Sequence, residues 1–114
     1  MKRYNHRILH ANDAMLPISF EFYPPKTDEQ RTQLDRSVQK LKAHAPQFMS
    51  VTFGAGGSTL SHTPETVQRL RSEHGVAGVP HLTCVGGNRE EIRSLLKLYR
   101  ALGCDRIVAL RGDT

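Results

Sequence analysis

Four short apolar runs of this chain each end in a polar side chain that can take part in catalysis, namely Glu21, Thr52, His81 and Asp113. A carboxyl group or an imidazole can donate or accept a proton, and a hydroxyl group can hydrogen-bond a ligand. The four residues lie about 30 residues apart, which is the length of a strand–helix repeat. In barrels built from such repeats, the carboxyl ends of the strands form the active-site face. The spacing therefore predicts one site assembled from four strand ends.

The segments that carry these residues have the patterns of strands. Strands are expected at 18–23, 48–53, 79–84 and 107–110. The first alternates apolar and polar residues, as a strand with two different faces does. The last is apolar on both faces, as is typical of a buried parallel strand.

Start and stop signals predict a helix in each of the three gaps. Thr27 and Asn88 each stand three residues before a side chain that completes a capping box. Thr63 precedes a proline and a glutamate, as an N-cap residue does. Gly75 and Gly103 are well placed to end helices. The predicted element order is therefore βαβαβαβ.

This order predicts an α/β fold with a parallel sheet, which is either doubly wound or part of a barrel. A complete (β/α)8 TIM barrel needs about 250 residues. The chain has 114 residues and holds the first three and a half β/α units. We therefore expect a flexible arm at 1–16 and, at 17–114, the N-terminal part of a truncated TIM-barrel domain. A small self-sufficient open sheet is the alternative.

Composition and charge exclude several classes of protein. The net charge is +5, but the basic residues are scattered and form no stripe with aromatic platforms, so no nucleic-acid partner is expected. A mildly basic surface that attracts anionic cofactors is the favoured interpretation. No apolar run approaches the roughly 20 residues that span a bilayer, and no apolar stretch follows the basic start. We expect a cytoplasmic protein with no membrane partner.

Glu21 lies in mid-strand between Phe20 and Phe22. A carboxylate that is desolvated there would have a raised pKa and stay protonated near neutral pH, as a general acid requires. The alternative is an outward-facing glutamate at the rim of the sheet. The pattern alone supports both interpretations equally.

Three further groups of residues have open interpretations. The glycine-rich loop at 54–59 could hold a phosphate or simply connect a strand to a helix. His81 could bind a ligand, titrate or make a structural hydrogen bond, and no short histidine spacing supports a metal site. The segment 111–113 reads Arg-Gly-Asp and fits a ligand site after a buried strand better than a cell-adhesion motif. The other five histidines are expected to be solvated, and Cys84 and Cys104 to be buried reduced thiols.

Four motifs in the same order and near the same spacing resemble 5,10-methylenetetrahydrofolate reductases. They are 19–25 (Ser-Phe-Glu-Phe-Tyr-Pro-Pro), 51–59 (Val-Thr-Phe-Gly-Ala-Gly-Gly-Ser-Thr), 80–84 (Pro-His-Leu-Thr-Cys) and 109–113 (Ala-Leu-Arg-Gly-Asp). The match covers essentially all of 17–114, and four motifs in register are specific.

This resemblance implies a flavoprotein that binds FAD, takes a hydride from NADH or NADPH, and passes it to methylenetetrahydrofolate to give 5-methyltetrahydrofolate for methionine synthesis. Glu21 matches the family's general acid. Asp113 also matches a residue that meets the folate substrate, and Thr52 one that lies near the nicotinamide. The positions that match flavin neighbours are Thr52, Phe53, Ala55, His81, Leu110, Arg111, Gly112 and Asp113.

The resemblance also implies what this chain lacks, because later strands of the family supply much of the adenosine and substrate binding. We expect the fragment alone to be inactive and the full-length protein to be a homo-oligomer. Two other functions stay open on the residues alone. One is a non-catalytic fragment or binding module, and the other is an unrelated TIM-barrel enzyme that binds a phosphorylated substrate.

Overall fold

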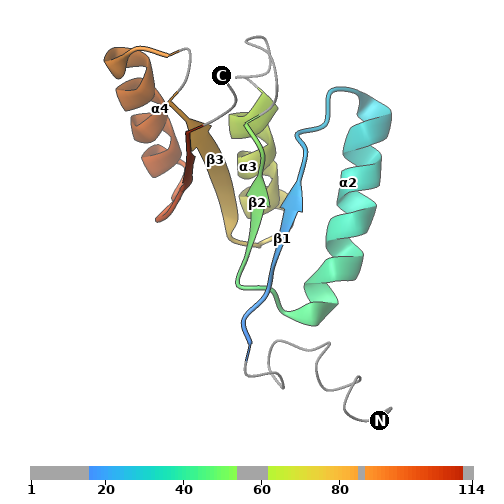
Figure 1. The fold of residues 1–114 in the computed structure, drawn as a ribbon. Helices are drawn as coiled ribbons and strands as arrows, with labels where there is room; N and C mark the ends of the chain where they lie inside the picture. Colours follow the sequence, from blue (N-terminus) through green and yellow to red (C-terminus); the bar gives the residue numbers. More distant parts are fainter. Residues whose placement is uncertain (1–15, 54–61, 85–86, 112–114) are drawn as a thin grey trace.

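The computed structural model describes residues 16–53, 62–84 and 87–111, and within them strands and helices alternate as expected (Figure 1). The elements in chain order are β1 (Ser19–Phe22), α2 (Asp28–Leu41), the short 3-10 helix η1 (Lys42–His44), β2 (Phe48–Val51), α3 (His62–Glu73), β3 (Gly78–Thr83), α4 (Arg89–Ala101) and β4 (Val108–Leu110). The predicted order βαβαβαβ is confirmed.

The four strands form one parallel sheet in the order β1-β2-β3-β4. A doubly wound sheet reverses its strand order at one point and carries helices on both faces. Here the order never reverses, and α2, α3 and α4 all contribute to one hydrophobic core. Sequential parallel strands with their helices on one face are the arrangement of a partial β/α barrel.

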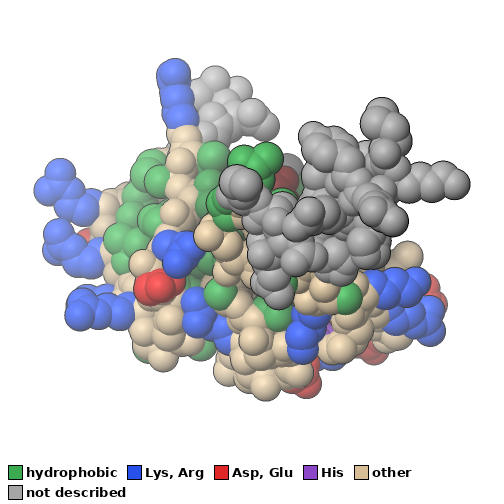
Figure 2. All heavy atoms as spheres, turned by 90° about the horizontal axis from the view of Figure 1, so that it is seen from below, with side chains coloured by type: hydrophobic (Ala, Val, Ile, Leu, Met, Phe, Trp, Pro, Cys, Tyr) green, Lys and Arg blue, Asp and Glu red, His purple; other side chains and the backbone are tan. Residues whose placement is uncertain are grey.

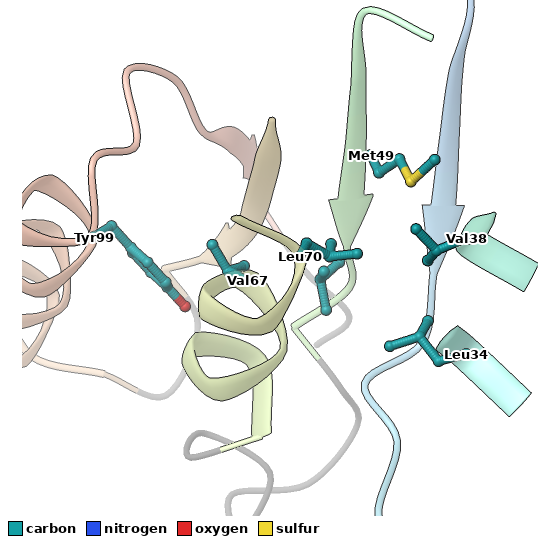
Figure 3. Close-up of a cluster of buried hydrophobic side chains, with 7 residues drawn as sticks. Leu34, Val38, Met49, Val67, Leu70 and Tyr99 are labelled. Atoms are coloured by element: carbon teal, nitrogen blue, oxygen red, sulfur yellow. The ribbon is translucent and has the colours of Figure 1, made fainter. Parts of the chain in front are cut away.

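The core lies between the sheet and the three helices (Figure 3). Its buried side chains are Met49 and Val51 of β2, Leu34 and Val38 of α2, Val67 and Leu70 of α3, and Tyr99 of α4. Full burial of one such aliphatic side chain stabilises the fold by about 1.5–3 kcal/mol. Since neighbouring residues of a strand point to opposite faces, the residues between the core positions face away from the helices.

The contact between α3 and β3 is close because β3 begins with a glycine. A Cβ atom at Gly78 would lie 2.9 Å from the carbonyl oxygen of Val67, which is too near for any other residue without a shift. The Nε atom of Arg71 donates a hydrogen bond to the carbonyl oxygen of Gly78 at 3.1 Å. The start of β3 is therefore held directly against α3.

Most of the predicted helix ends are confirmed. The Thr27 and Asn88 side chains accept hydrogen bonds from the first turns of α2 and α4. Gly75 and Gly103 follow the ends of α3 and α4 with φ of 64° and 93°, a backbone region that favours glycine. The predicted N-cap at Thr63 is wrong, because α3 begins at His62 and Thr63 lies inside its first turn.

The prediction that 107–110 is buried on both faces is also wrong. Ile107 is 36% exposed and Leu110 is 41% exposed. The reason is that β4 is an edge strand, and in the described part of the chain only β3 pairs with it. On α4, Leu96 and Leu98 are also exposed.

Several predictions concern residues outside the described ranges. They are the arm at 1–16 except for its last residue, the glycine-rich loop with Ala55, and the pair Gly112 and Asp113. No helix in 16–53, 62–84 or 87–111 is long and apolar enough to cross a membrane. Seen from the end of the sheet at which the strands begin, lysine and arginine side chains stand at several separate places rather than in one patch (Figure 2).

Candidate functional site

Three of the predicted site residues lie together on the sheet face that points away from the helices. In β1 and β2, Glu21 pairs in register with Ser50. One pleat further along, Thr52 and His81 follow the paired residues Val51 and Pro80 of β2 and β3. The sheet register therefore places Glu21, Thr52 and His81 on one face near the carboxyl ends of three adjacent strands.

Glu21 and His81 are in direct contact. The Nε2 atom of His81 lies 3.3 Å from the Oε1 atom of Glu21, which is an ion pair when the imidazole is protonated. The His81 side chain is 8% exposed, whereas the Glu21 side chain is 60% exposed. The expected desolvation of Glu21 is therefore not found. The exposure of its side chain agrees with the alternative interpretation, an outward-facing glutamate at the rim of the sheet. The carboxyl group is open to a ligand.

Thr52 is held by its backbone and has a free hydroxyl group. Its amide donates to the carbonyl oxygen of Phe22 at 2.9 Å, which extends the ladder between β1 and β2. Its own carbonyl oxygen accepts a hydrogen bond from the Thr63 hydroxyl at 2.9 Å. The Thr52 Oγ1 atom is buried without a hydrogen-bond partner in the described part of the chain. A buried hydroxyl left unpaired costs about 1–3 kcal/mol, so this atom is suited to a bound ligand.

Thr63 is a further residue of this site, although the sequence pattern predicts it only as a helix N-cap. Its buried hydroxyl also lies 3.3 Å from the carbonyl oxygen of Phe53, so it ties α3 to the end of β2. The Thr-Pro-Glu pattern correctly marked the start of a helix. The hydrogen-bond partner is a strand end eleven residues earlier, which no local pattern indicates.

The end of β4 contributes the fourth part of the site face. Leu110 pairs in register with Thr83, one pleat beyond the level of His81 and Val108. Arg111 follows and is exposed. Glu21, Thr52 and His81 are thus brought together on three strands, and Leu110 and Arg111 lie at the same end of the fourth.

A second histidine–carboxylate cluster lies between α2 and α3. The Nε2 atom of His74 is 2.7 Å from the Oδ1 atom of Asp35, and its Nδ1 atom is 2.9 Å from the Gln39 amide. Two nitrogen atoms of Arg69 donate to Asp35 at 3.0 and 2.6 Å. The Arg69 guanidinium, followed by His74, lowers the pKa of Asp35 from 3.8 to about 2 against the opposing effect of burial. His74 is buried, so its expected solvation is wrong.

A shallow cavity of about 210 Å³ lies beside this second cluster. It is lined by Pro25, Arg31, Glu65, Thr66, Gln68, Arg69, Ser72 and Glu73. None of the predicted site residues lines it, and its charges are mixed. The residues with suitable chemistry therefore mark the strand ends as the candidate site, and the cavity is a gap between two surface helices.

The two cysteines differ from each other. Cys104 is a free thiol, as expected, but it is half-buried rather than fully buried. Burial raises the pKa of this thiol. Cys84 is exposed, so the expected burial of this thiol is wrong. It directly follows the last residue of β3.

The sequence profile of the methylenetetrahydrofolate reductase family matches residues 6–114 of this chain. The 5,10-methylenetetrahydrofolate reductase of Salmonella typhimurium is 38% identical over 100 residues, which cover 88% of this chain and 34% of that protein. The protein of the same name from Buchnera aphidicola is 42% identical over 107 residues, which cover 94% of this chain and 36% of that protein.

A plant relative matches the same region. The maize protein named methylenetetrahydrofolate reductase (NADH) 1 is 38% identical over 103 residues, which cover 90% of this chain and 17% of that protein. The chain therefore spans about a third of the length of these bacterial relatives and about a sixth of the plant one.

Proposed function

This chain belongs to the methylenetetrahydrofolate reductase family, and on that premise we propose that the protein carrying it reduces 5,10-methylenetetrahydrofolate to 5-methyltetrahydrofolate with NADH or NADPH through bound FAD. The observation that supports this most is the meeting of Glu21, Thr52 and His81 on the sheet face that points away from the helices, at the carboxyl ends of three strands. The name of the maize relative specifies NADH, which makes NADH the first reductant to test.

The described residues fit a bound flavin. The Thr52 hydroxyl is buried and unpaired there, and a hydrogen bond to a ring edge would satisfy it. The residues proposed to hold the cofactor are Thr52, Phe53, Ala55, His81, Leu110, Arg111, Gly112 and Asp113. The exposed Arg111 guanidinium offers a positive charge to an electron-rich ring or a phosphate. When bound, FAD supplies the hydride-carrying ring system.

The proposed role of Glu21 is to donate a proton to the folate as its five-membered ring opens. A proton on the departing nitrogen makes ring opening easier and leaves a carbon that can accept hydride. The side chain is 60% exposed, so a substrate can approach it without displacing other side chains. Asp113 is the proposed second contact to the folate.

The cysteines bear on the location of the protein, and its exposed apolar side chains bear on assembly. Both cysteines are free thiols, which fits the reducing cytoplasm. Exposed apolar side chains at Leu96, Leu98 and Leu110 are available for contact with other parts of the protein or with further copies. We propose a cytoplasmic homo-oligomer.

The function is tested on the complete product of the gene, purified with added FAD. The expected result is a flavin absorbance band in the visible region that NADH or NADPH bleaches and methylenetetrahydrofolate then restores. A protein that acquires no flavin absorbance would contradict the proposal. So would a flavin that is reduced by the nicotinamide but never reoxidised by the folate.

A further inference from the structure

The contact between Glu21 and His81 joins an exposed side chain to a buried one. Glu21 lies on β1, at the edge of the described sheet, and its side chain is mostly in solvent. His81 lies on β3, which pairs with β2 on one side and β4 on the other, and its side chain is buried. An exposed glutamate ordinarily samples many rotamers. The buried imidazole is therefore the better fixed of the two partners in this contact.

The contact joins a donor to an acceptor. An imidazole that carries hydrogen on Nε2 can donate toward Oε1 of the carboxyl group, and Oε2 is then the oxygen that His81 does not engage. The separation of 3.3 Å is long for a hydrogen bond, as is common for catalytic groups before a ligand is bound.

We propose that His81 is a positioning residue for Glu21: its Nε2–H group holds Oε1, so that Oε2 is directed to the bound folate. This inference rests on the proposed function. It differs from a role for His81 in flavin contact alone, because it predicts that loss of the imidazole affects mainly the step in which Glu21 gives up its proton.

The kinetic test compares three variants of the FAD-loaded complete gene product. In His81→Leu we expect the folate-dependent reoxidation of the flavin to slow by about 10- to 100-fold through kcat with little change in KM, since a small misplacement of a catalytic group has effects of that size. His81→Gln retains an N–H donor and should recover most of that loss. His74→Gln removes a second buried histidine, whose contacts among the described residues are with Asp35 and Gln39 rather than with the site, and should leave the rate unchanged.

Two further measurements, FAD affinity and the rate of flavin reduction by the nicotinamide, separate positioning from cofactor binding. In His81→Leu, the fold-loss in each of them should be at least ten times smaller than the fold-loss in the folate step. The double variant Glu21→Gln/His81→Leu should be no slower than Glu21→Gln alone, because His81 acts through Glu21. Equal losses in FAD affinity and in both half-reactions would overturn the proposal. So would losses that multiply in the double variant.

A spectroscopic test works without turnover and without a change at His81. The ¹⁵N resonances of the His81 imidazole, recorded in the complete gene product, should show hydrogen on Nε2. They should shift in Glu21→Gln and stay in place in Asp35→Asn, whereas the His74 resonances should do the reverse. If the protein proves not to bind flavin, the proposed function fails, and this measurement still reports the contact. His81 resonances that ignore Glu21→Gln would overturn the inference.

Discussion

Two buried histidines in the described part of the chain each contact one carboxylate, and the two pairs differ in how fully that carboxylate is engaged. Between α2 and α3, Asp35 is bound by Arg69 through two hydrogen bonds and by His74 through a third contact. On the opposite face of the sheet, Glu21 contacts His81 through one oxygen atom, and its side chain is 60% exposed.

This difference separates a structural carboxylate from one that can react. The pKa of Asp35 is lowered to about 2 by Arg69 and His74, so at neutral pH it is a permanent anion that joins two helices. Glu21 has one oxygen atom held and the rest of its carboxyl group open to a substrate. A fully bound carboxylate contributes to the stability of the fold, whereas a partly bound one is available for proton transfer.

The largest expected effect comes from Glu21→Gln. The amide has nearly the shape of the acid but no acidic proton, so folate reduction should fall by about 100- to 10,000-fold, the usual contribution of a general acid. Flavin reduction by the nicotinamide should continue, and the free energy of unfolding should change little because the side chain is exposed. Stopped-flow absorbance measures the two half-reactions separately. Equal loss of both would remove Glu21 from the proposed role.

Asp35→Asn is the matched change in the other pair. The amide cannot neutralise Arg69, and the buried His74 loses its anionic partner. We expect the free energy of unfolding to fall by about 2 kcal/mol, as when a charged hydrogen-bond network is broken. Both half-reactions should keep their rates once the protein is folded. Urea unfolding gives the stability, and a variant as stable as the original would show that this cluster does not hold the helices together.

A smaller effect follows from acid titration of the same cluster. The pKa of Asp35 is near 3.8 in the unfolded chain and about 2 in the folded protein. Between these values the unfolded state binds more protons, so the stabilisation by Asp35 is complete above about pH 4 and is lost as the pH falls through about 2. The stability difference between the original protein and Asp35→Asn should therefore shrink over this interval. A difference that stays constant would contradict the assignment.

The smallest expected effect is that of Thr63→Val, which keeps the shape of a fully buried side chain and removes its hydroxyl. The carbonyl oxygen of Thr52 loses a hydrogen bond, so the free energy of unfolding should fall by about 1 kcal/mol. FAD affinity should also weaken, because the end of β2 is less firmly placed. Fluorescence titration with FAD measures this, and Thr66→Val, which loses only a bond to the backbone of its own helix, is the control.

The elements of the fold were predictable from the sequence because their signals are local. The N-caps at Thr27 and Asn88 and the glycines at 75 and 103 act within one helical turn, and all four of these helix ends are confirmed. The burial of 107–110 was not predictable, since apolar residues in a strand do not reveal whether a neighbour covers them. The exposure of Leu110 depends on the position of β4 at the sheet edge.

The candidate site was predictable in part. The spacing of the strand ends predicted that Glu21, Thr52 and His81 would share one face, and the register of the strands agrees. The desolvation of Glu21 was inferred from its aromatic neighbours along the chain, but these point to the other face of the sheet, into the core. The cluster around Asp35 and His74 was missed because its members lie 39 residues apart and meet only through helix packing.

The most direct test of this account is the single-turnover rate at which methylenetetrahydrofolate reoxidises the reduced flavin, measured in Glu21→Gln and Asp35→Asn side by side. We expect a rate at least about 100-fold lower in Glu21→Gln and an unchanged rate in folded Asp35→Asn. A normal rate in Glu21→Gln, or an equal loss in both variants, would contradict the claim that the singly held carboxylate is the one that reacts.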